Sequence, residues 1–231
     1  MKSIGLIGGT SWESTLEYYR LINQRAKERL GGLHSARALI ASLDFAPLEE
    51  GMRHGRWDMV AGQLAAAAES LERGGADFFL LCSNTTHKCA EQVAGAVTIP
   101  LLHIGEAIGL EAKRLGLTDL GLFGTRFVME DDFLQGFLRE KAGVRCLIPD
   151  AASRTAINRI IFEELCLGSF TERSRAFFQA EIDRLKERGA QGVILGCTEI
   201  PMLIKAEDSS LPVIDTTAVH AQAAVDQALS V

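Results

Sequence analysis

A cysteine and a serine occupy equivalent places in two similar stretches of this 231-residue chain. Residues 75–85 resemble residues 189–199, and in that alignment Ser83 falls on Cys197. Both side chains carry a proton that a reaction at carbon can use, although the thiol, with an ordinary pKa of about 8.5, is much the stronger acid. If the two stretches face each other about a pseudo-twofold axis, Ser83 and Cys197 approach one cleft from opposite sides. Such a pair would suit the movement of a proton between the two faces of a planar carbanion.

The repeat extends beyond these two stretches. Two more pairs of segments match in the same order, namely residues 4–8 with 120–124 and residues 99–102 with 211–214. Three ordered matches indicate two related halves of about 110 residues, which is a common domain size. We therefore predict two domains, the first of residues 1–105 plus 212–231 with Ser83, and the second of residues 106–211 with Cys197.

Short apolar runs alternate with longer amphipathic stretches, which is typical of βαβ units and a parallel sheet. The apolar runs predict strands at residues 3–8, 37–43, 77–82, 119–123, 144–148, 192–196 and 212–214. The amphipathic stretches predict helices at residues 10–30, 58–73, 105–115, 130–142, 152–167, 171–188 and 216–229. Residues 44–57, with Pro47 and two glycines, predict a loop. We expect an α/β fold of two similar pseudo-symmetric domains, each a parallel sheet flanked by helices, with the active site in the interdomain cleft.

Polar residues follow four of the predicted strands. In open α/β sheets ligands bind beyond the carboxyl ends of the strands, and each such turn should open a helix whose backbone N–H groups attract an anion. We expect Thr10 and Glu13 to form a capping box on the first of these helices. The residues predicted to bind a small carboxylate substrate are Gly9, Thr10, Asn84, Thr85, Thr125, Thr198 and Glu199.

Cys197 comes directly after a predicted strand, at the expected N-terminus of a helix. The helix dipole would lower the pKa of its thiol, and the position would leave it partly exposed. A buried core cysteine is the alternative, because cysteine is among the most buried residue types. Thr198 could cap the helix or bind a ligand, and Glu199 could orient the thiol or bind an ammonium group. Simple capping is the alternative for both.

Ser83 has a hydroxyl that does not ionise at neutral pH without help, and its alternative role is a helix cap or a hydrogen bond to backbone. Cys82 precedes it on the strand, so its side chain should point the opposite way, into the core. His87 could support Ser83, and a surface histidine is the alternative. The remaining cysteines fall inside predicted elements, where we expect them to be core residues: Cys89, Cys146 and Cys166.

Composition excludes several classes of protein. The net charge is −6 and no basic block occurs, which argues against nucleic acid binding. No apolar run approaches the roughly 20 residues of a membrane span, and the N-terminus lacks the apolar core of a signal peptide. Five cysteines without a scaffold-like spacing predict reduced thiols in a cytoplasmic protein. The scattered histidines predict no zinc site, and the Gly8–Gly9 turn lacks a dinucleotide fingerprint.

Several motifs resemble the aspartate/glutamate racemase family, within the wider Asp/Glu/hydantoin racemase superfamily. The similarity covers essentially the whole chain and is carried by residues 8–13, 84–87, 122–125, 160–168 and 196–201. It implies two similar α/β domains, a homodimer, and racemisation of an amino acid by two cysteines that flank the α-carbon, without pyridoxal phosphate or metal. The usual first motif is Cys-Asn-Thr, whereas this chain has Ser83, Asn84 and Thr85. The chain therefore resembles most closely the L-aspartate/glutamate-specific relatives that carry a hydroxyl residue there.

The resemblance implies a cofactor-independent racemase of aspartate or glutamate, with Cys197 as the main acid and base and Ser83 as the weaker partner. Two other functions remain open. A single cysteine on this scaffold would also suit decarboxylation of a malonate-type acid, with Cys197 protonating an enolate from one side. A protein that binds an amino acid and has lost turnover is the other alternative.

Overall fold

The computed structural model describes residues 1–230, which form two compact units. Unit 1 comprises Met1–Ile104 and the segment that begins at His220, and unit 2 comprises Gly105–Val219. The sequence placed residues 212–219 in the first domain. The structure places them in unit 2, because the strand Val213–Asp215 pairs with the sheet of that unit. Among the described residues, no helix has the length and apolar character needed to cross a membrane.

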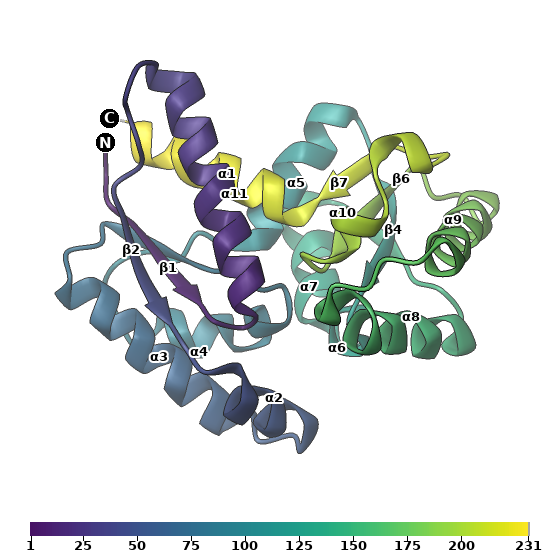
Figure 1. Cartoon of the computed structure of the whole chain (residues 1–231), viewed down its shortest axis with the longest axis horizontal. Coiled ribbons are helices and arrows are strands. Elements are labelled where there is room, and N and C mark those ends of the chain that lie inside the picture. Colours follow the sequence, from purple (N-terminus) through teal and green to yellow (C-terminus); the bar gives the residue numbers. More distant parts are fainter. Residues whose placement is uncertain (231) are drawn as a thin grey trace. The chain divides into compact units, whose positions relative to one another are not determined.

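Unit 1 holds a parallel three-stranded sheet of order β2-β1-β3. Its strands are β1 (Ile4–Gly8), β2 (Ala38–Ser42) and β3 (Phe78–Leu81). Its helices are α1 (Trp12–Leu30), α2 (Phe45–Arg53), α3 (Trp57–Arg73), a 3₁₀ turn (Thr85–Cys89), α4 (Ala90–Ala94) and the C-terminal part of α11 (Thr216–Leu229). In Figure 1, α1 and α11 lie on one side of this sheet and α3 lies on the other. Side chains of β1 and β3 pack with those of α1 and α11 into one buried cluster.

Unit 2 holds a parallel four-stranded sheet of order β5-β4-β6-β7. Its strands are β4 (Asp119–Gly124), β5 (Arg145–Leu147), β6 (Gly192–Gly196) and β7 (Val213–Asp215). Its helices are α5 (Ile104–Leu115), α6 (Arg126–Glu130), α7 (Asp132–Phe137), a π turn (Leu138–Ala142), α8 (Ala151–Glu163), a 3₁₀ turn (Leu165–Leu167), α9 (Glu172–Glu187), α10 (Ile200–Leu203), a 3₁₀ turn (Ala206–Asp208) and the start of α11. Residues of α8 and α9 pack onto β4 and β6, with Phe123 and Phe178 edge to face.

The strand pairing confirms the predicted repeat. Ile4 pairs with Phe78 in unit 1, and their aligned residues pair in unit 2, Leu120 with Gly192. The bridge of Phe79 to Leu101 likewise corresponds to the pairing of Val193 with Val213. Only a single bridge forms at Leu101, whereas its counterpart lies in a three-residue strand. The three strands of the first sheet and their counterparts in the second therefore lie in the same order, and the aligned strands pair in the same register.

The close approach of a helix to the first strand of each unit also repeats. A Cβ atom on Gly5 would lie 3.1 Å from Leu71 Cδ1 of α3, and one on Gly121 would lie 2.8 Å from Leu185 Cδ1 of α9. Glycine at these two aligned positions lets the helix pack against the strand backbone.

Three local predictions were wrong. Residues 45–53 form α2 rather than a loop. Pro47 lies in the first turn of this helix, where backbone N–H groups have no acceptor within the helix, so its missing N–H does not break a hydrogen bond. Residues 126–142 are divided into α6, α7 and a π turn, since Asp131 is extended. The first long helix is capped by Ser11, whose side chain accepts a hydrogen bond from the Ser14 amide, and not by a capping box from Thr10 to Glu13.

Candidate functional site

Thr125 and Cys197 follow two paired strands of unit 2. Gly124 and Gly196 are register partners at the ends of β4 and β6, so the next residues emerge at the same edge of the sheet. A Cβ atom on Gly196 would lie 2.7 Å from the carbonyl oxygen of Phe123, which leaves room only for glycine. Thr125 is buried and caps α6, because its hydroxyl accepts a 3.4 Å hydrogen bond from the Val128 amide. The structure thus gathers the predicted residues of the second domain at one sheet edge.

One carboxylate oxygen organises the turn after β6. Cys197 Sγ donates a 2.8 Å hydrogen bond to Glu199 Oε2, and Thr198 Oγ1 donates another of 2.8 Å to the same atom. Glu199 is buried and Cys197 is half-buried. Of the two predicted roles of Glu199, orientation of the thiol is the one that this geometry supports. Thr198 does not cap the helix, because the cap position of α10 is Glu199.

The thiol of Cys197 is protonated at rest. Burial raises its pKa well above the ordinary value, and the negative charge of Glu199, the nearby Cys166 and the hydrogen bond to Glu199 raise it further. The predicted lowering of this pKa was therefore wrong. The expected helix dipole is weak because α10 has only four residues, and the thiol is hydrogen-bonded to the carboxylate of the residue that precedes this helix. Cys197 can donate a proton as it stands, and Glu199 is the group beside it that can accept one.

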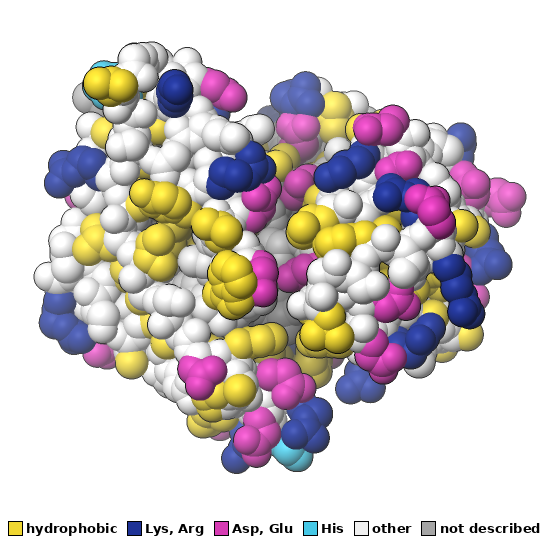
Figure 2. Space-filling view, viewed as in Figure 1, with side chains coloured by type: hydrophobic (Ala, Val, Ile, Leu, Met, Phe, Trp, Pro, Cys, Tyr) yellow, Lys and Arg dark blue, Asp and Glu magenta, His cyan; other side chains and the backbone are white. Residues whose placement is uncertain are grey.

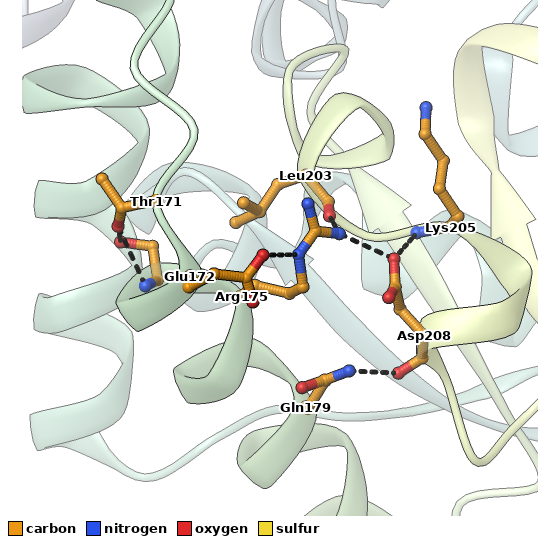
Figure 3. A network of polar contacts seen from close by, with 8 residues as sticks. Thr171, Glu172, Arg175, Gln179, Leu203, Lys205 and Asp208 are labelled. Carbon is orange, nitrogen blue, oxygen red and sulfur yellow. Dashed lines mark hydrogen bonds and ion pairs between the residues drawn. The ribbon is translucent and has the colours of Figure 1, made fainter.

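An arginine on α9 holds the chain beyond α10 (Figure 3). Arg175 donates from Nη1 to Asp208 Oδ2 at 2.8 Å and to the carbonyl oxygen of Leu203, the last residue of α10. Asp208 Oδ2 also accepts a 2.9 Å hydrogen bond from the Lys205 amide. These contacts fix the segment that carries the turn of Cys197. Nothing in the sequence indicated this role, because one arginine on an amphipathic helix is ordinarily a surface charge.

In unit 1, the predicted residues also follow two paired strands. Ile7 pairs with Leu81 near the ends of β1 and β3, so Gly9 and Thr10 emerge beside Ser83, Asn84 and Thr85. The side chains of Thr10, Asn84 and Thr85 are buried, and that of Ser83 is half-buried.

Gly9 is required at its position. Its φ is 84°, and a Cβ atom there would lie 2.0 Å from the carbonyl oxygen of Leu43. Its amide donates a 2.8 Å hydrogen bond to Thr15 Oγ1. The glycine turn is thereby anchored to α1, and it packs closely against the chain after β2.

The histidine and the cysteines that the sequence singled out have defined positions in the structure. Cys82 is buried in the core cluster of unit 1, as predicted from the alternation along the strand. His87 is buried rather than on the surface, and its Nδ1 donates a 2.8 Å hydrogen bond to the carbonyl oxygen of Ser83, not to the hydroxyl. Cys89 is buried, and Cys166 is half-buried against the core of unit 2, close enough to affect the pKa of Cys197.

The predicted site residues thus form two clusters, one at the carboxyl edge of each sheet. That the two clusters face one cleft stays a prediction. Among residues 1–230, no three His, Cys, Asp or Glu side chains are arranged to hold a metal ion.

Comparison with known proteins assigns the family. The sequence profile of the Asp/Glu/hydantoin racemases matches residues 7–224. The structure superposes on a candidate Asp/Glu racemase from Yersinia pestis with a TM-score of 0.94 and 49% identity, over 100% of both chains. An aspartate racemase homologue from Pyrococcus horikoshii OT3 gives 0.87 and 32%, again over 100% of both chains. The broad specificity amino-acid racemase RacX of Bacillus subtilis strain 168 is 26% identical over 163 residues, which are 71% of this chain and 70% of RacX. The predicted α/β fold and isomerase class are confirmed, and the chain belongs to the Asp/Glu/hydantoin racemase family.

Proposed function

We propose that this amino-acid racemase acts on aspartate or glutamate without a cofactor, with Cys197 as the main acid and base and Ser83 as the weaker partner on the opposite face of the α-carbon. The observation that carries the proposal is the equivalence of the two turns. β3 and β6 keep the same register in their sheets, and Ser83 and Cys197 follow them at aligned positions. The names of two relatives support acidic substrates, and the name of the Bacillus relative supports a wider range.

The hydrogen bond between Cys197 and Glu199 suggests the sequence of proton transfers. Glu199 receives the thiol proton, and the resulting thiolate removes the α-proton, so that the C–H bond breaks and an S–H bond forms. The carbanion is delocalised into its carboxylate and becomes planar. Ser83 then gives its hydroxyl proton to the other face, directly or through water. The alkoxide regains a proton from solvent, and Glu199 returns its own proton to solvent.

A hydroxyl opposite a thiol makes the two half-reactions unequal. Free enantiomers have the same energy, so kcat/KM is equal in the two directions whatever the site contains. The enantiomer whose α-proton faces Cys197 should nevertheless exchange that proton with solvent faster than it inverts, because reprotonation from Ser83 is the slower step. The other enantiomer should show little exchange without inversion.

Chiral chromatography and α-proton exchange in heavy water test this function. We expect Cys197→Ala to abolish inversion, Ser83→Ala to lower it by about 10²-fold, and Ser83→Cys to raise it above the rate of the unmutated protein. Cys146→Ala is the matched control, because Cys146 of β5 pairs with Leu120 near the start of β4, away from the carboxyl edge of its own sheet. Equal exchange from both enantiomers would contradict the unequal roles. Release of CO₂ from a malonate, or binding without inversion, would replace racemisation by one of the two alternative functions.

We also propose a cytoplasmic homodimer, on the strength of the family resemblance and of an exposed apolar stripe on α1. Trp12, Leu16 and Tyr19 share one helical face and are 64%, 58% and 44% exposed. Figure 2 shows hydrophobic side chains gathered over the part of α1 that contains them. Light scattering tests the dimer: Leu16→Glu should yield monomers, whereas the same change at Arg73, an exposed residue of α3, should not.

A further inference from the structure

Histidines flank both points at which the chain passes between the units. The chain leaves unit 1 after Ile104, and His103 is the residue before Ile104. The chain returns to unit 1 at His220. The ring of His87 is near both, with its centroid 4.6 Å from that of His103 and 5.9 Å from that of His220. All three rings are buried in unit 1.

The hydrogen bonds of His87 assign its tautomer. Its Nε2 accepts a 3.1 Å hydrogen bond from the Ile104 amide, which can only donate. The proton of a neutral ring must therefore be on Nδ1, from which it is donated to the carbonyl oxygen of Ser83. A protonated ring would direct an N–H group at the Ile104 N–H group. Burial lowers the pKa of His87, and so do His103 and His220, so the ring stays neutral.

His220 holds the same segment from another direction. Its Nε2 donates a 2.9 Å hydrogen bond to the carbonyl oxygen of Leu102, and the hydroxyl of Tyr18 donates one of 2.9 Å to its Nδ1. The segment from Leu102 to Ile104 is thus bound at both ends by imidazole rings. One of these rings belongs to the 3₁₀ turn after Ser83, and the other belongs to α11.

We propose that His87 is a positioning residue, which ties the Ser83 turn to the start of α5 and so keeps the hydroxyl in place for reprotonation of the α-carbon. This inference rests on the proposed function, in which Ser83 serves one face of that carbon. The ring acts on the backbone of Ser83 and does not touch the hydroxyl. Thr86 Oγ1 donates a second hydrogen bond, of 3.0 Å, to the same carbonyl oxygen, so two buried side chains fix the turn. A displacement of about 1 Å at a reacting group can cost about 10²-fold in rate.

Two conservative variants separate the two hydrogen bonds of the ring. An asparagine at position 87 can donate from near the place of Nδ1, and a glutamine can accept near the place of Nε2. We expect His87→Gln to lower inversion by about 10- to 100-fold, while exchange of the α-proton that faces Cys197 stays within about threefold of the unmutated rate. His87→Asn should restore most of the inversion. Thr86→Val, which removes the second bond, should change the same ratio in the same direction. His34→Gln, at an exposed site, is the control.

Three outcomes would overturn the inference: full inversion by His87→Gln, a parallel fall of inversion and exchange, or no advantage of His87→Asn over His87→Gln. The first two would show that the carbonyl contact does not position Ser83, and the third would show that Nδ1 is not the effective atom. Amide hydrogen exchange gives a readout that needs no turnover. The Ile104 amide should exchange faster in His87→Asn than in His87→Gln, and unchanged exchange would refute the tie. If the unmutated protein inverts no amino acid, the proposed function fails, and amide exchange still decides whether His87 fixes the turn.

Discussion

Acidification from pH 7 to pH 5 should destabilise unit 1. Burial lowers the pKa of His103 to about 4 and that of His220 to about 4, from an ordinary value of 6.5. The unfolded chain therefore binds protons below about pH 6.5 that the folded chain does not bind until about pH 4. The stabilisation is complete above pH 6.5 and is lost as the pH falls toward 4.

The size of the effect follows from these values. Between pH 7 and pH 5, each of the two histidines should cost about 2 kcal/mol of the free energy of unfolding, because one pKa unit corresponds to about 1.4 kcal/mol. The pKa of His87 is lowered as well, which acts in the same direction. Against a typical total of about 5–15 kcal/mol, a loss of about 4 kcal/mol is large.

Urea unfolding at pH 5, 6 and 7 measures this loss. Tryptophan fluorescence reports on the correct unit, because Trp12 and Trp57 are the only tryptophans and both belong to unit 1. We expect His220→Gln to be less stable than the unmutated protein at pH 7 but to lose about 2 kcal/mol less on acidification. The exposed His34→Gln should leave the pH dependence unchanged. Equal stability of the unmutated protein at pH 5 and pH 7, or an unchanged pH dependence in His220→Gln, would refute the reasoning.

Three other changes have defined outcomes. Glu199→Gln removes the negative charge that helps to raise the pKa of Cys197, so iodoacetamide should label this thiol faster at pH 8; slower labelling would contradict the assignment. Arg175→Met removes the bonds to Leu203 and Asp208, and should lower both kcat and, by roughly 1–3 kcal/mol, the free energy of unfolding; an unchanged kcat would show that the turn holds its shape alone. Gly62→Ala on α3 meets no atom within 4 Å and should stabilise the protein by about 0.5–1 kcal/mol in the same urea assay, whereas a loss of stability would show that this face of α3 has no room for a methyl group.

The fold was largely predictable because the two halves of the sequence repeat the same pattern of strands. Matching residues 4–8 with 120–124 identified β1 and β4 as counterparts, and the strand register agrees residue by residue. The second domain boundary was missed, because an apolar run such as residues 212–214 shows that a strand exists but not which sheet it joins. Residues 45–53 were not predicted as a helix because proline usually disrupts a helix, and the sequence did not show that Pro47 lies in the first turn, where proline is tolerated.

The site was predictable as a set of positions but not as a set of interactions. Polar residues that follow strands must lie at the carboxyl edge of a parallel sheet, which placed Thr125 and Cys197 correctly. The direction of the Glu199 side chain depends on a rotamer, and this rotamer reverses the predicted shift in the pKa of Cys197. The role of His87 depends on contacts with a segment 17 residues away in the sequence, which no local pattern encodes.

The discontinuous chain path of unit 1 affects the order of folding during synthesis. Its core includes Ala221, Ala224 and Val225 of α11, and the Lys2 amide donates a 2.9 Å hydrogen bond to the carbonyl oxygen of Ala228. A ribosome adds roughly 5–20 residues per second, so these partners of the first strand emerge on the order of 10 s after the rest of unit 1. Unit 2 is continuous and is complete earlier. The half of the protein that is translated first is therefore finished last, and its unfilled apolar face is the part that a chaperone would have to cover in the meantime.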